Sequence, residues 1–145
     1  MSKIPVNFFS EDIPFTLKQK TVLKNWILQT IQAEGFQLTE LNFIFCSDNY
    51  LLEINQQYLK HDTYTDIVTF DNSEEAKKIL GDIFISVERT RENARAFKVS
   101  PSDELHRVII HGVLHLLGYK DKTKAEKALM SQKEDEYLQK RGFKK

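Results

Sequence analysis

Residues 108–117 constrain the fold most, because they are apolar nearly all round the helix that they are predicted to form. The apolar side chains are Val108, Ile109, Ile110, Val113, Leu114, Leu116 and Leu117. A helix without a polar face has to be buried inside the protein. The chain of 145 residues can bury it, since a domain of about 150 residues buries roughly 70% of its unfolded surface. We therefore expect one compact domain packed around this helix.

Two histidines lie on the same predicted helix, four residues apart. His111 and His115 share a face, where Cβ atoms at this spacing are about 5–6 Å apart. A lone histidine on an apolar helix is more often a core residue satisfied by one hydrogen bond. Burying two imidazoles side by side is costly unless both have partners, and one metal ion serves both. The pair therefore favours a metal site.

A third candidate ligand follows the end of the helix. Gly118 stands where a helix often ends in a left-handed residue, which would turn the chain and carry Asp121 back towards the histidines. An aspartate in a short loop is also a common turn or cap residue. Two nitrogens and one carboxylate oxygen would leave a position open for water or substrate, as in catalytic zinc sites and unlike structural sites with four protein ligands. The pattern predicts a catalytic metal site at the end of a buried helix.

Other helices are predicted from caps and apolar spacing. Thr16 begins a capping box for a helix over 16–34, and Thr123 begins another before a last helix. Ser47 or Asp48 caps a helix whose inner face would carry Leu51, Ile54 and Tyr58. Residues 88–97 read as helical, and Ser100 followed by Pro101 begins the helix of the histidines.

Three apolar, β-rich runs are predicted to be strands. They cover residues 41–46, 66–70 and 81–87. The last two are separated by a polar connection, so we expect them to form an antiparallel pair. In the last run Ile83, Ile85 and Val87 would share one face.

The amino-acid composition says more about the cellular compartment of the protein than about its binding partner. The single cysteine, Cys46, excludes an internal disulfide framework and a cysteine-based zinc knuckle, and fits a reducing compartment. The first residues lack the apolar core of a signal peptide, and no apolar run approaches the ~20 residues of a membrane span. We expect a soluble, cytoplasmic protein. Lys plus Arg and Asp plus Glu both total 21, so net charge does not decide whether the partner is a polyanion.

The spacing of the candidate ligands resembles the signature of metzincin metalloproteases. Proteases of that kind need a glutamate directly after the first histidine as general base, and this chain has Gly112 there. The sequence therefore disfavours a protease of that mechanism.

A second resemblance extends over most of the chain. Its motifs are Asn55-x-x-Tyr58, Thr65-Asp66-Ile67-Val68-Thr69-Phe70, Leu80-Gly81-Asp82-Ile83, His111-Gly-x-Leu-His115-Leu-x-Gly118-Tyr119 and Met130-x-x-x-Glu134. In this order and spacing they resemble the YbeY family of bacterial rRNA maturation factors. The resemblance implies one domain over 1–145, with an α+β fold in which about five helices cover a mixed sheet of about four strands.

The same resemblance implies a function. It is that of a zinc-dependent endoribonuclease that prefers single strands, matures the 3′ end of small-subunit ribosomal RNA and takes part in ribosome quality control. One zinc ion per chain and ribosomal RNA with the small ribosomal subunit would be its cofactor and partners. The family usually has a histidine as third ligand, where this chain has Asp121. Aspartate is a competent zinc ligand, and its shorter side chain requires the loop to lie closer.

The residues that would act on RNA are less sharply defined by the sequence. The family typically has an arginine after the tyrosine, suited to holding a phosphate, and here Leu59 stands there. Lys60 and His61 are candidates for its role, or ordinary loop residues. Asp66 and Glu88 are candidates for the catalytic base, although each could simply cap or pair.

A stripe of basic residues is a candidate RNA contact. Arg91, Arg95 and Lys98 share a helical face, which could equally be a solvated surface. Two other classes of function stay open. One is a ribosome-associated binding module with a structural metal, and the other is a hydrolase of another substrate, peptides included.

Overall fold

A four-stranded mixed sheet forms the centre of the computed structural model, which describes residues 3–59 and 65–141. Its strands are β1 (Val6–Ser10), β2 (Gln37–Cys46), β3 (Ile67–Asp71) and β4 (Lys78–Ser86). They lie in the order β1-β2-β4-β3, and β3 is antiparallel to β4 while the other neighbours are parallel. The antiparallel pair predicted from the sequence is confirmed.

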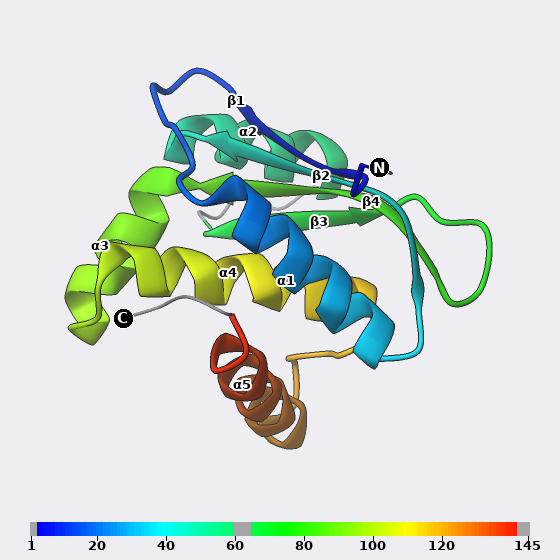
Figure 1. The fold of residues 1–145 in the computed structure, drawn as a ribbon. Coiled ribbons are helices and arrows are strands. Elements are labelled where there is room, and N and C mark those ends of the chain that lie inside the picture. The colour runs from blue at the N-terminus through cyan, green and yellow to red at the C-terminus, as the bar shows by residue number, and fades with distance from the viewer. Residues whose placement is uncertain (1–2, 60–64, 142–145) are drawn as a thin grey trace.

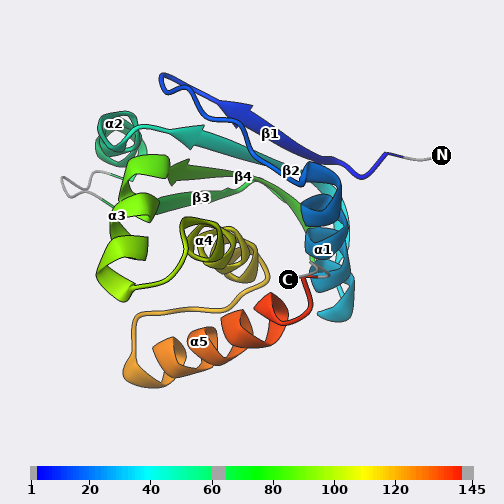
Figure 2. The ribbon, with the colours of Figure 1, turned by 60° about the vertical axis from the view of Figure 1, so that its left-hand side comes forward.

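Within the described residues the sheet is accompanied by five helices, as the family resemblance implied. They are α1 (Lys20–Ala33), α2 (Asp48–Leu59), α3 (Val87–Phe97), α4 (Pro101–Leu116) and α5 (Lys124–Leu138). Figures 1 and 2 show α4 between the sheet and α5, with α1 beside it and α2 on the other side of the sheet. No helix within 3–59 and 65–141 is long and apolar enough to cross a membrane.

The main core lies between α4 and the sheet. Alternate strand residues face α4, among them the fully buried Phe43, Ile83 and Ile85. The apolar side chains of α4 meet them, and Ile109 and Ile110 are also fully buried. Burial of each such side chain stabilises the fold by about 1.5–3 kcal/mol. The predicted buried helix is therefore the central element of the domain, and packing on the sheet fixes the position of the helix that carries the histidines.

Helix caps agree with the sequence in three of four places. Ser47 Oγ accepts the Tyr50 N–H, Ser100 Oγ accepts the Asp103 N–H, and Thr123 forms a capping box with Glu126. The box predicted at Thr16 is wrong. Helix α1 begins four residues later, after Gln19 in a left-handed conformation with φ of 59°. The preceding Leu17 is buried in the core, so tertiary packing overrides the local capping pattern.

Three further features differ from the sequence-based expectation. Strand β1 was not predicted, although it adds a parallel edge and stacks Phe8 on Phe43 with ring centroids 5.5 Å apart. Strand β2 begins at Gln37 rather than at residue 41. On α2 the inner face carries Leu51 and Asn55, whereas Tyr58 is 64% exposed and contacts the edge of Phe70.

Gly81 allows strands β3 and β4 to approach each other, and we predict that its substitution destabilises the sheet. A Cβ atom at Gly81 would lie 2.4 Å from the backbone oxygen of Phe70. We expect Gly81→Ala to lower the free energy of unfolding by roughly 1–3 kcal/mol, the usual cost of overpacking. Urea denaturation measures it. Lys78→Ala on the same strand removes only an exposed ion pair with Glu75 and should change stability by less than about 0.5 kcal/mol. Equal stability of the two variants would contradict the role of Gly81 in the close approach of β3 and β4.

Candidate metal centre

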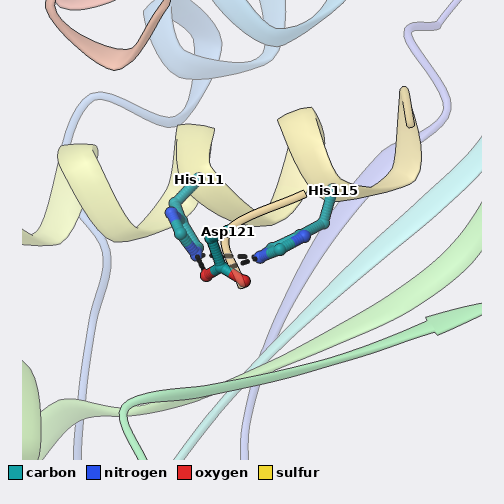
Figure 3. Close-up of side chains that lie close together, drawn as sticks. All are labelled: His111, His115 and Asp121. Atoms are coloured by element: carbon teal, nitrogen blue, oxygen red, sulfur yellow. Dashed lines mark hydrogen bonds and ion pairs between the residues drawn. The ribbon is translucent and has the colours of Figure 1, made fainter. Parts of the chain in front are cut away.

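Three side chains converge at the C-terminal part of α4 (Figure 3). The His111 and His115 Nε2 atoms are 3.0 Å apart, and Asp121 Oδ2 lies 3.3 Å from each of them. Ligands about 2.0–2.1 Å from a tetrahedral zinc ion are separated by roughly 3.3 Å. The three atoms are therefore spaced as the ligands of a single ion, and among the described residues they form a group that could hold a metal.

The turn after α4 brings Asp121 back to the histidines. Gly118 has φ of 105°, its N–H donates to the His115 oxygen, and the Tyr119 N–H donates to the Leu114 oxygen, both at 3.0 Å. This pair of bonds is a Schellman motif, which requires the left-handed conformation that glycine adopts at low cost. The reversal predicted from Gly118 is confirmed, and it places the loop beside the helix face that carries both imidazoles.

Each histidine is held by a hydrogen bond at Nδ1, the nitrogen that faces away from the cluster. His115 Nδ1 lies 3.0 Å from the backbone oxygen of Tyr119, and His111 Nδ1 lies 2.5 Å from Glu134 Oε2. Both partners are acceptors, so the neutral rings carry their proton on Nδ1 and expose a lone pair on Nε2. Two lone pairs and a carboxylate oxygen facing one point repel each other unless a cation lies between them. The donor set therefore fits a bound metal ion.

In the part of the chain that the structure describes, Glu134 is one of the few buried charged side chains, at 6% exposure. Its other oxygen accepts a hydrogen bond of 2.8 Å from Arg107 Nη1, and Arg107 Nη2 donates to Asp135 at 2.7 Å. Burial by itself lowers the pKa of His111. The bond to Glu134 and the negative charges of Glu134, Asp121 and Asp66 outweigh it, so the pKa of His111 is raised. Protons therefore compete with a metal for this ligand as the pH falls.

A cavity of about 270 Å³ opens onto the cluster. Besides the three candidate ligands, it is lined by residues from the end of α2 and from β3 and the segment before it: Leu59, Thr65, Asp66, Ile67, Val68 and Thr69. Burial raises the pKa of Asp66, although His111 and a backbone hydrogen bond act in the opposite direction. The structure thus brings one of the two predicted catalytic carboxylates to the candidate metal centre, together with Leu59.

The other predicted site residues lie elsewhere. Glu88 Oε1 accepts the Asp48 N–H at 2.8 Å, so Glu88 caps α2 and does not line this cavity. Arg91 lines a different cavity, between α3, the start of α4 and residues 14–19, and Arg95 is exposed on α3. Lys60 and His61 lie outside the described residues.

Sequence reasoning gave no role to two residues that shape the site. In the sequence Glu134 belongs to a family motif, and its spacing from Met130 and Tyr137 places it on the buried face of α5. In the sequence Gly112 stands out only because it lacks the carboxylate of a zincin protease. A Cβ at Gly112 would lie 2.8 Å from Ile67 Cδ1 and 3.1 Å from two carbons of Ile83. Any side chain at the position where a zincin protease requires a glutamate would therefore have to displace Ile67 and Ile83.

Comparison with known proteins shows what this chain is similar to. Residues 6–142 match the family model described as endoribonuclease YbeY. The chain is 50% identical over 143 residues to an endoribonuclease YbeY of Cytophaga hutchinsonii, covering 99% of this chain and all of that protein. It is 55% identical over 130 residues to that of Flavobacterium psychrophilum, covering 90% and 92%. A solution structure of a Thermotoga maritima protein superposes with a TM-score of 0.66 and 28% identity, covering 94% and 88%.

Proposed function

The chain belongs to the YbeY family of endoribonucleases, and we propose that it hydrolyses single-stranded RNA at the cluster of His111, His115 and Asp121. We further propose that its substrate is ribosomal RNA, at the 3′ end of the small-subunit molecule, and that it acts with the small ribosomal subunit in the cytoplasm. The observation that carries the site assignment is the convergence of three ligand atoms on one point, beside a cavity of about 270 Å³.

The proposed cofactor is one zinc ion per chain. Zinc with three protein ligands keeps a position open, lowers the pKa of water to about 7 and polarises a phosphoryl oxygen. In this chain the two histidines offer unprotonated Nε2 atoms and Asp121 offers a carboxylate oxygen. Iron, manganese and cobalt also accept this set of ligands, so the assignment to zinc rests on the family resemblance.

Asp66 is the proposed catalytic base. It lines the same cavity as the ligands, and its raised pKa makes its carboxylate a better proton acceptor than an ordinary aspartate. Glu88 was the alternative, but its bond to the α2 backbone gives it a capping role. We therefore place proton transfer on Asp66 alone.

Contacts to the RNA backbone are proposed for basic residues beyond Leu59, whose apolar side chain lines the cavity. Lys60 follows it in the chain and is the nearest candidate in sequence. Neither Arg91 nor Arg95 lines the catalytic cavity. They would contact RNA only if the RNA strand extends from this cavity past α3.

The alternatives have less support from the site. A structural zinc ion normally has four protein ligands, and here three described side chains converge and a cavity adjoins them. A zincin-like peptidase would need a carboxylate after the first histidine, where this chain has Gly112, packed closely against Ile67 and Ile83.

Metal removal tests the proposed function directly. We expect chelator-treated protein to lose cleavage of an end-labelled single-stranded RNA and to recover it on addition of one equivalent of zinc. A duplex of the same sequence should be cut at least tenfold more slowly. Unchanged cleavage after complete metal removal would contradict the proposal. Zinc-loaded protein that binds the RNA without cutting it would instead favour the binding module.

A further inference from the structure

We propose that Glu134 is a positioning residue for the metal centre, fixing His111 in the tautomer that presents Nε2 to the ion. This inference rests on the proposed function, because it assigns His111 as a metal ligand. Glu134 comes from α5, which crosses beneath α4 (Figure 2), so it joins the metal centre to a helix that supplies none of the three candidate ligands. Outer partners of this kind orient metal-binding histidines in many proteins.

The two oxygens of Glu134 bond to different partners. Oε2 lies 2.5 Å from His111 Nδ1, and Oε1 accepts from Arg107 Nη1 at 2.8 Å. The other end of the guanidinium is held by Asp135 at 2.7 Å. With one oxygen committed to an arginine that can only donate, the second oxygen faces the imidazole as an acceptor. His111 must then carry its proton on Nδ1.

The two histidines are fixed in different ways. His115 bonds to the backbone oxygen of Tyr119, which no substitution can remove without moving the turn. His111 depends on a side chain, and its bond to Glu134 is the shorter of the two. Glu134 is therefore the position at which the tautomer of a ligand can be changed while the ligand itself stays in place.

Glu134→Gln is the informative substitution, because glutamine has the same shape but only one acceptor atom. Arg107 still requires an acceptor, so the amide oxygen should turn to it and the NH₂ group should face His111. The imidazole would then have to accept at Nδ1 and carry its proton on Nε2, where the ion binds. We expect zinc affinity to fall roughly 10–100-fold, the usual effect of losing an outer partner. A wrong tautomer with intact geometry has similar or larger effects on catalytic histidines.

A second substitution should reverse the effect of the first. In Glu134→Gln combined with Arg107→Met, no arginine claims the amide oxygen, so the amide can turn its oxygen to His111 Nδ1. We expect the double variant to bind zinc at least several-fold more tightly than Glu134→Gln alone. If Glu134 only connects α5 to α4, removal of Arg107 should lower zinc affinity further.

Asp135→Asn is the matched control. It removes the neighbouring carboxylate, which bonds to the same arginine, while the bond of Glu134 to His111 is left in place, and its zinc affinity should stay within about twofold of wild type. Zinc affinity is measured by competition with a chromophoric chelator. The ¹⁵N shifts of the His111 ring in metal-free protein report the tautomer, which should change in Glu134→Gln alone, and thermal unfolding monitors the fold.

The outcomes are distinguishable. Glu134→Gln with wild-type zinc affinity and an unchanged tautomer would overturn the role of Glu134, as would a double variant that is folded and no better than the single one. If the double variant does not fold, the tautomer of His111 decides: a change in Glu134→Gln and none in Asp135→Asn supports the proposal, and any other result contradicts it. Wild-type protein that binds no zinc would overturn the proposed metal site itself, whatever the tautomer of His111.

Discussion

Replacement of His115 by alanine is expected to abolish zinc binding and RNA cleavage while leaving the protein folded. The side chain of His115 is 25% exposed and lies at the edge of the core, so its loss removes little buried apolar surface. With one nitrogen gone, two candidate ligands remain and the ion becomes poorly held. The affinity should fall by more than the 10–100-fold typical of losing an outer partner, because His115 would contact the ion directly.

His106 provides a matched control for this substitution. It is a histidine of the same helix, but its ring is buried against Trp26 and bonded to Arg141, outside the cluster. Burial is the main cause that lowers the pKa of His106 to about 4, so it is a neutral core residue. His106→Gln should therefore keep one zinc per chain even where it lowers stability.

Metal analysis, circular dichroism and cleavage of single-stranded RNA together decide the outcome for His115→Ala. A folded variant that retains one zinc per chain, or cleaves at the wild-type rate, contradicts the assignment. Loss of zinc together with loss of the fold would favour the structural metal. The wild type and His106→Gln, measured at the same zinc concentration, set the scale for both readouts.

Sequence reasoning reached the metal cluster because its parts are local. His111 and His115 share a face by helix geometry, and Gly118 turns the chain within three residues. The same holds for the caps at Ser100 and Thr123. Each of these features is decided by residues within about one or two helical turns, which is the range over which a sequence pattern determines structure.

The features that were missed depend on packing between distant segments. Glu134 is 23 residues from His111, and their contact exists only because α5 crosses α4. Strand β1 joins the sheet through pairing with residues 41–45, which its own short sequence does not reveal. The local sequence at Thr16 predicts a helix cap, and the position of Glu88 next to β4 predicts a catalytic base, but distant contacts override both predictions. Leu17 is buried in the core, so the helix begins after Thr16. The Asp48 N–H of α2 donates to Glu88, so Glu88 caps that helix.

Asp121→Asn is the second substitution expected to have a large effect, because it removes the only charge among the three candidate ligands. The amide is nearly identical in shape and keeps one oxygen, yet it leaves a divalent cation with three neutral ligands. We expect zinc affinity to fall more than about tenfold, and cleavage at limiting zinc to fall with it. Asp71→Asn makes the same change of charge at an exposed strand end, where the carboxylate bonds to the Ser73 N–H, and should leave both unchanged.

Asp121→His separates the ligand role of Asp121 from a role in the loop alone, since histidine is the residue that the family resemblance implies at this position. A third imidazole should restore zinc binding that asparagine loses. Because a neutral ligand leaves more positive charge on the ion than a carboxylate does, the acidic limb of the pH–rate profile should move to lower pH in the histidine variant. An aspartate that only shapes the loop would give a different result. Asn should then bind zinc as well as the wild type does, and the longer histidine would disturb a turn whose carboxylate now lies 3.3 Å from both imidazoles.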